Sequence, residues 1–109
     1  MPIQAQPPLP PPDTRVYVTP DAGVYADPAI LRPGYPIQGS VRLINPTSTD
    51  LAIKQTTDWF DASGLHITTV LSAPERMVVP RLGDAYIKLV APTPNAVQFQ
   101  VRVEPDLIN

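Results

Sequence analysis

The strongest constraint on the fold of this chain is an alternation of apolar and polar residues around a polar turn near its middle. Residues 41–43 alternate before the turn, and Ile53 and Trp59 follow it at a spacing that places both on one face of an extended strand. Residues 45–50 are turn formers, and Gly64 ends the stretch where a turn requires a positive φ. The stretch therefore predicts two neighbouring β-strands, followed by a second tight turn at Gly64.

Further short segments are β-branched or alternate in the same way, and prolines or glycines separate them. These segments are Thr14–Thr19, a piece near Ala29–Arg32 inside a proline-broken edge segment, Ile37–Leu43, Leu65–Val70, Met77–Val79, Ala85–Ala91 and Val97–Val103. No window repeats apolar residues at helical spacing. About seven short strands with regular turn signals predict an all-β fold, an antiparallel two-sheet sandwich.

The inner faces of these strands give the predicted core. Gly39 interrupts one strand, which indicates a bulge or the close approach of another backbone. The predicted core residues are Val41, Leu43, Ile53, Trp59, Ile67, Ile87, Leu89, Val97, Phe99, Val101 and Val103.

A proline-rich arm, residues 1–13, precedes the predicted sandwich domain, residues 14–109. The chain has 16 prolines, and six of them fall within the first 12 residues. Proline fixes φ and donates no N–H, so the arm is predicted to be an extended polyproline II segment. The arm is either a semi-rigid spacer or a docking peptide with P-x-x-P spacing. Its candidate partner-binding residues are Pro7, Pro8, Leu9, Pro10, Pro11 and Pro12.

Composition limits the class of protein. At 109 residues the chain is one domain at most, and its net charge of −2 gives no basic excess for nucleic acid or an anionic membrane. It has no Cys, which excludes disulfides, thiolate metal sites and a Cys nucleophile. The given chain shows no signal peptide, and no apolar run approaches the roughly 20 residues that a membrane span needs.

Residues with chemistry of their own are few and scattered. His66 is the one histidine of the chain. A metal site would require it to gather with Asp58, Asp61 and Asp84, and no ligand spacing supports that. Asp58 and Asp61 point to opposite faces of an extended chain, so they do not form an acid–base pair, and Asp61 is predicted to cap its turn. No catalytic, metal-binding or cofactor-binding residue is predicted.

Two polar residues share the predicted inner face of Trp59. Gln55 and Thr57 occupy alternate positions before it, and burying such side chains costs free energy unless they are hydrogen-bonded. Trp59 is therefore predicted to be the central core residue. The alternative is that Gln55, Thr57 and Trp59 form the walls of a ligand cleft.

Four motifs give the chain a resemblance to a known family. They are VRLINPT at residues 41–47, WFDASG at 59–64, VAPTPNA at 90–96 and FQVRV at 99–103. Through them, residues 41–103 resemble the YcfL-like family of periplasmic lipoproteins of Gram-negative bacteria, whose function is largely unassigned. The resemblance implies an immunoglobulin-like β-sandwich and a periplasmic or outer-membrane-associated location.

The chain departs from that family at three places. It has Gln55 and Thr57 where the family has aromatic or apolar residues, and Ser72-Ala73 where a second Trp is common. It also lacks the Cys that carries the lipid of a mature lipoprotein.

The predicted function is a non-enzymatic protein-interaction or structural module of a bacterial envelope-associated or secretion-type assembly. It would dock through its proline-rich arm and its sheet edges, bind protein partners rather than nucleic acid, and need no cofactor. Self-association is open, and the chain itself is not expected to span a membrane. The alternative is a small-ligand-binding or hydrolytic domain that uses the Trp59 face.

Overall fold

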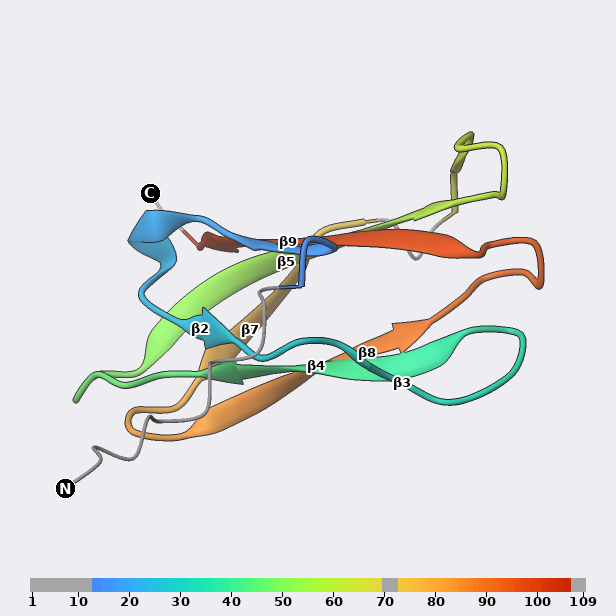
Figure 1. The fold of residues 1–109 in the computed structure, drawn as a ribbon. Coiled ribbons are helices and arrows are strands. Elements are labelled where there is room, and N and C mark those ends of the chain that lie inside the picture. Colours follow the sequence, from blue (N-terminus) through green and yellow to red (C-terminus); the bar gives the residue numbers. More distant parts are fainter. Residues whose placement is uncertain (1–12, 70–72, 107–109) are drawn as a thin grey trace, which may run out of the picture.

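A computed structural model describes residues 13–69 and 73–106, which form two packed β-sheets (Figure 1). The strands are β1 (Val16–Val18), β2 (Tyr25–Ala26), β3 (Ile30–Leu31), β4 (Gln38–Ile44), β5 (Leu51–Phe60), β6 (His66–Ile67), β7 (Glu75–Val79), β8 (Asp84–Val90) and β9 (Gln98–Pro105). A short 3₁₀ helix, η1 (Pro20–Ala22), occupies the predicted turn after β1. The predicted all-β, two-sheet fold is thus confirmed.

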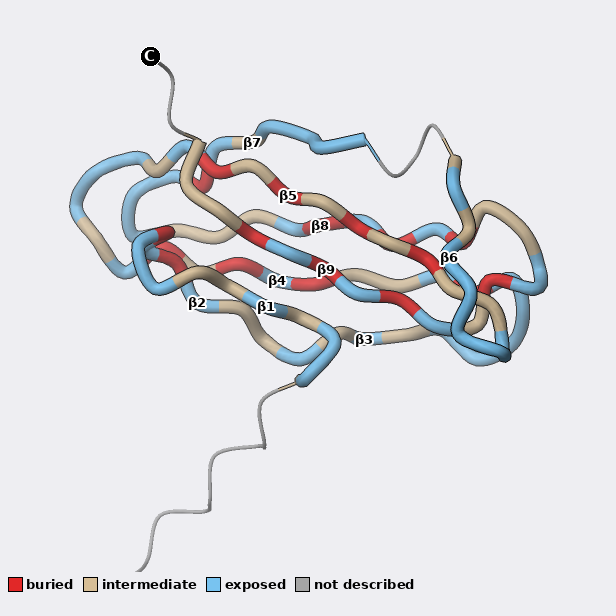
Figure 2. Tube along the Cα trace, turned by 90° about the horizontal axis from the view of Figure 1, so that it is seen from above, coloured by how far each residue is buried: buried red, intermediate tan, exposed pale blue. Residues whose placement is uncertain are grey.

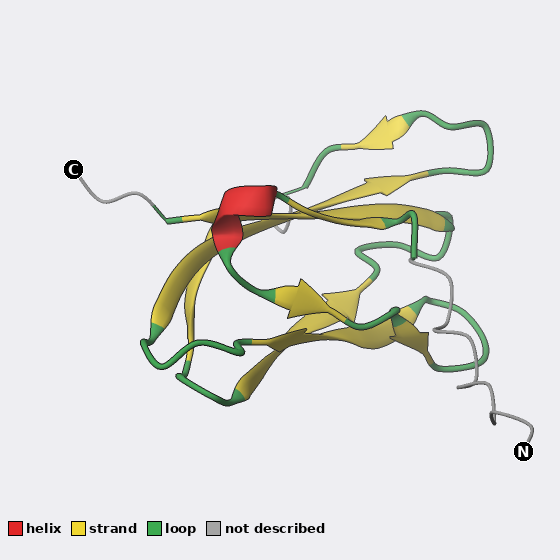
Figure 3. Cartoon of the chain, turned by 60° about the vertical axis from the view of Figure 1, so that its left-hand side comes forward, coloured by secondary structure: helices red, strands yellow, loops and turns green. Residues whose placement is uncertain are grey.

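The two sheets have different strand orders (Figures 1 and 3). Sheet A runs β1-β9-β5, and both β6 and β7 pair with the far edge of β5. In sheet B, β2 and β3 pair with one edge of β4, and β8 pairs with the other. All pairings are antiparallel except that of β1 with β9, which is parallel and was not predicted.

The described residues contain nine strands rather than about seven, and one of the additional strands arises because the proline-broken edge segment splits into two. Pro28 has no N–H to donate to β4, and the N–H of Ala29 bonds to the Asp13 carboxylate instead, at 3.0 Å. The ladder is therefore interrupted, which leaves the unpredicted β2 on one side of Pro28 and the predicted piece, now β3, on the other.

Other predicted boundaries were wrong by a few residues. Of the predicted strand 65–70, only β6 is a strand in the described part, and β7 begins at Glu75 rather than Met77. The last strand begins at Gln98 and includes Pro105, which pairs with Ile53. Pairing at the ends of short edge strands depends on the partner strand more than on the local sequence pattern. The exact strand boundaries are therefore not predicted from the sequence.

The core lies between the sheets, where buried and exposed residues alternate along the strands (Figure 2). Trp59 is 1% exposed, and its ring lies 5.5 Å from that of Phe99, centroid to centroid. Nine of the predicted core residues are buried, but Ile67 and Val97 are only half-buried because they lie at the end of sheet A. The core also includes buried residues that were not predicted: Ala22, Val24, Ile37, Val79, Ala91 and Ala96.

Gly39 allows β3 to approach β4 closely, as predicted. A Cβ atom at this position would lie 2.3 Å from the carbonyl oxygen of Ile30, far inside van der Waals contact. The predicted turn glycine is also confirmed, since Gly64 has a φ of 85°.

We expect Gly39→Ala to lower the free energy of unfolding by roughly 1–3 kcal/mol, because β3 must move away from β4. Ser40→Ala, the matched control on the neighbouring residue, should change it by less than about 0.5 kcal/mol. Urea unfolding measures both. Equal stability of the two variants would show that β3 tolerates displacement and does not restrain β4.

Candidate functional site

The sandwich has two flanks where the edges of the two sheets face each other. On the N-terminal flank, β1 of sheet A faces β2 and β3 of sheet B. On the opposite flank, which we call the open flank, β6 and β7 of sheet A face β8 of sheet B (Figure 2). The two flanks differ in how the chain covers them.

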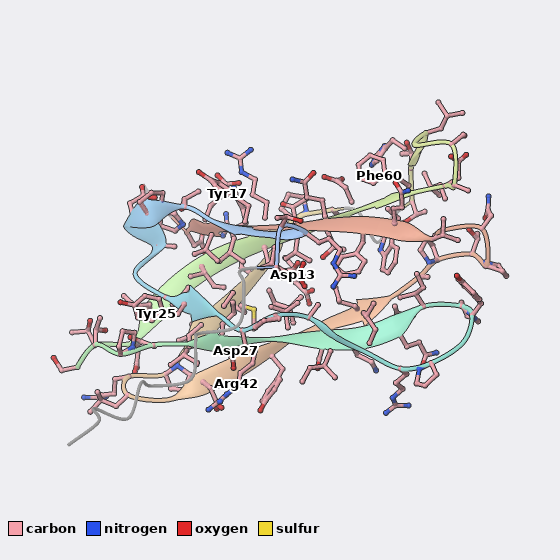
Figure 4. The ribbon with its side chains drawn as sticks, in the orientation of Figure 1. Asp13, Tyr17, Tyr25, Asp27, Arg42 and Phe60 are labelled. Carbon is pink, nitrogen blue, oxygen red and sulfur yellow. The ribbon has the colours of Figure 1, made fainter. Side chains whose placement is uncertain are left out.

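A charged clamp joins the sheets on the N-terminal flank. The carboxylate of Asp13 accepts hydrogen bonds from Arg15 Nε at 2.9 Å and from the backbone N–H of Ala29 at 3.0 Å. The Arg15 guanidinium in turn lies 4.8 Å from the centroid of the buried Phe99 ring. Figure 4 shows Asp13 between the two sheets. The hydrogen bond from the Arg15 side chain is the main cause that lowers the pKa of the Asp13 carboxyl to about 2, and the backbone hydrogen bonds act in the same direction.

On the open flank, the outer edge of β8 has no strand beside it among the described residues. Gly83 accepts a bond from Asn45, and Ala91 donates one to Ile37, so the odd-numbered residues of β8 bond to β4. Backbone groups alternate in direction along a strand. The N–H and C=O groups of the even-numbered residues therefore point away from β4. These residues are Asp84, Tyr86, Lys88 and Val90.

The facing edge of sheet A is interrupted. β7 pairs with β5 only as far as Gln55, and β6 begins opposite Trp59. The carbonyl groups of Ala52 and Phe60 accept bonds on the β9 side, so the backbone N–H and C=O of Thr57 point toward the interruption. Two strand edges thus expose hydrogen-bonding groups on the same flank.

A cleft of about 250 Å³ lies between these edges. Thr57 Oγ1 donates to Gln55 Oε1 at 3.0 Å, and Gln55 Nε2 donates to Glu75 Oε2 at 2.9 Å. The remaining wall residues are Trp59, Lys88 and Val90. Gln55 and Thr57 are buried but hydrogen-bonded to each other, which removes much of the cost of burying them.

The structure therefore brings Gln55, Thr57 and Trp59 together around one cleft, and its binding of a ligand stays a prediction. The predicted arm contacts, Pro7, Pro8, Leu9, Pro10, Pro11 and Pro12, lie outside the described residues.

The other candidate groups serve local structure. His66 Nε2 lies 3.2 Å from Asp58 Oδ1 on the outer face of sheet A, away from the cleft. Asp61 caps its turn by accepting bonds from Ser63 and Leu65, as predicted, and these bonds lower its pKa. Asp84 pairs with Arg42 on the outer face of sheet B. Among the described residues, no cluster of three or more acidic or histidine side chains could hold a metal ion.

The sequence did not point to three residues that contribute to the cleft or to the turn that supports the sheets. Glu75 and Lys88 complete the cleft, but they come from strands whose relative placement the sequence does not show. Asn45 is 1% exposed and donates from Nδ2 to the carbonyls of Thr49 and Val79, which joins the β4–β5 turn to the end of β7. An Asn at the start of a turn signals capping of that turn, but not burial.

Comparisons with known proteins show the fold and a family. Residues 25–105 match the family described as "Protein of unknown function (DUF1425)". A DUF1425 family member from Shewanella sp. pv-4 has a similar crystal structure, with a TM-score of 0.67, 13% identity, and coverage of 79% of this chain and 81% of that chain. The Campylobacter jejuni protein cj0090 is also similar, with a TM-score of 0.61, 15% identity, and coverage of 86% of this chain and 100% of that one. None of the curated proteins compared with this chain matches it.

We expect the clamp to make stability depend on pH. Because the folded pKa of Asp13 is about 2 against an ordinary 3.8, its contribution is fully present above pH 4 and is lost as the pH falls toward 2. Asp13→Asn should therefore cost roughly 2 kcal/mol at pH 7 and clearly less at pH 2.5. Urea unfolding at both pH values measures this, with the exposed Asp21→Asn as the control. An equal cost of Asp13→Asn at both pH values would contradict the assignment.

We expect the polar pair of the cleft to be dispensable for folding. In Gln55→Leu/Thr57→Val both hydrogen-bonding partners become apolar, so the free energy of unfolding should stay within about 1 kcal/mol of the wild type. Thr57→Val alone, which deprives Gln55 of its donor, should cost about 1–3 kcal/mol. Chemical unfolding of all three proteins gives the comparison, and a double variant less stable than the single one would show that the pair is structural.

Proposed function

Because this chain belongs to the DUF1425 family, whose function is unknown, we propose a function from its own geometry: a non-enzymatic module that binds an extended segment of a partner protein. The proposal rests on the outer edge of β8, which no described strand covers and whose even-numbered residues direct their N–H and C=O groups outward. Such an edge accepts a further strand by main-chain hydrogen bonds.

The surroundings of this edge support the proposal. Two apolar side chains project beside it on the outer face of sheet B, Tyr86 at 58% exposed and Val90 at 38%. Side chains of a paired strand would contact them across the ladder. β8 is also well anchored, since all its residues pair with β4, so it can accept a partner without reordering.

We propose the cellular location of this function from the sequence. The DUF1425 match is compatible with the YcfL-like resemblance, and with it we propose a periplasmic or outer-membrane-associated assembly as the place of action. The proline-rich arm would add a second contact to protein partners. Within the described residues there is no helix with the length and hydropathy that a membrane span requires.

A second candidate is a small-ligand site in the cleft, and the observation that favours it is the cavity on the Trp59 face. Its hydrogen-bonding side chains are those of Gln55, Thr57 and Glu75. The one histidine lies elsewhere, on the outer face of sheet A, so the hydrolytic version of this candidate has less support than simple binding.

We expect Tyr86→Pro to abolish partner binding without unfolding the domain. The N–H of Tyr86 points outward, so proline removes a group offered to the partner and no bond to β4. Tyr86→Ala, which keeps the N–H, is the matched control. Capture from envelope extracts with quantitative mass spectrometry should find a protein that the wild type and Tyr86→Ala retain and Tyr86→Pro loses at least about tenfold, equivalent to 1.4 kcal/mol. If all three capture the same proteins equally, the edge is not the binding site.

A further inference from the structure

A groove of about 500 Å³ lies on the outer face of sheet B, where β4 begins and β8 ends. The middle strand β4 forms its floor, and side chains from β3 and β8, on either side of β4, form its two walls. This outer groove is separate from the cleft between the sheets. Its lining side chains are Ile30, Arg32, Gln38, Ser40, Lys88 and Val90.

The walls of the outer groove carry two cations and two apolar side chains. Residues paired across a sheet project to the same side, and Ser40 pairs with both Ile30 and Lys88, so these two face each other across β4. One row along, Arg32 and Val90 face each other in the same way, because both bond to or pair with Gln38. The cations therefore occupy one diagonal of the groove. The other diagonal is apolar, with Ile30 at 73% exposed and Val90 at 38%.

The cations of this groove are distinguished by having no counter-charge. All eight lysine and arginine residues of the chain lie in the described part, and five arginines form ion pairs there with aspartate or glutamate. The three that form no ion pair with a described residue are Arg32, Lys54 and Lys88. Two of these three line the outer groove, and no acidic residue of the described part lines it.

The rest of the same face shows what these two cations lack. Arg42, also on the outer face of sheet B, lies 2.7 Å from an Asp84 oxygen and 3.7 Å from an Asp27 oxygen. In the groove, the side chains of Gln38 and Ser40 form no hydrogen bond with another described residue. Four neighbouring polar side chains thus have unused hydrogen-bonding groups, and two of these side chains are positive.

The geometry suits a single anionic group above β4. The register places the Cα atoms of Arg32 and Lys88 roughly 12 Å apart, two strands across and two residues along. Both side chains are long enough to reach a group held between Gln38 and Ser40. The arginine fork matches the oxygens of a carboxylate or phosphate, and the lysine adds a point charge.

We propose that the outer groove binds a small molecule that carries one oxyanion, a carboxylate or a phosphate, on a short apolar group. The oxyanion contacts Arg32 and Lys88, and the apolar group lies against Ile30 or Val90. The groove spans three strands but only two rows of side chains, roughly 10 Å by 7 Å, which fits a small molecule better than an extended chain. It does not use the outer edge of β8, so this inference does not rest on the proposed function.

Binding of three small probes to the full-length chain, labelled with ¹⁵N and followed by NMR, tests the proposal. The probes are hexanoate, hexyl phosphate and the uncharged hexanol. We expect at least one anion to bind at least tenfold more tightly than hexanol and to shift the amide signals of Arg32, Ser40 and Lys88. The tighter of the two anions identifies the oxyanion, and added salt should weaken its binding.

Variants separate a built site from a general attraction to positive charge. Arg32→Gln/Lys88→Gln should weaken binding of the tighter anion at least tenfold. Lys54→Gln is the matched control, because Lys54 also has no ion pair with a described residue but lies on the outer face of sheet A, and it should change binding less than twofold. Either of two results would overturn the proposal: neither anion binds more tightly than hexanol, or the double variant loses no more affinity than Lys54→Gln.

Discussion

The structure depends on β5, whose side chains alternate between the two faces of sheet A along an uninterrupted pairing with β9. Eight consecutive residues of β5 pair with β9, and this register brings Trp59 against Phe99. Side chains alternate strictly along such a ladder. A strand that buries Ile53 and Trp59 must therefore also turn Gln55 and Thr57 inward. The polar cleft is a direct consequence of the register, and moving these residues outward would require a bulge that breaks the pairing.

The cleft exists because sheet A and sheet B both end on that flank with no covering strand among residues 13–69 and 73–106. The pairing of β5 passes from β7 to β6 with an interruption opposite Thr57, and β8 is an edge strand along its whole length. Proteins usually protect such edges with charges or short strands. Here the Asp13 clamp ties together the sheets on the other flank, so the asymmetry between the flanks comes from the chain's own N-terminal residues.

The local sequence pattern correctly predicted the structural features that depend only on residues close together in the chain. The two-sheet class, the close approach at Gly39, the turn at Gly64 and the inward placement of Gln55 and Thr57 all follow from period-2 alternation and backbone requirements. The parallel pairing of β1, the burial of Asn45 and the presence of Glu75 and the β8 edge at one cleft do not. They depend on which strands lie side by side, and that is decided by packing between distant segments.

The placement of the N-terminal flank opposite the open flank has a consequence for symmetry. Among the described residues, the edge available for binding lies on one flank only, because β2 and β3 occupy the other side of β4. A strand that joined β8 would therefore lengthen sheet B in a single direction. Two copies that met through their β8 edges would each use the same surface, so a two-fold axis would relate them and the pair would have no free β8 edge for a third copy.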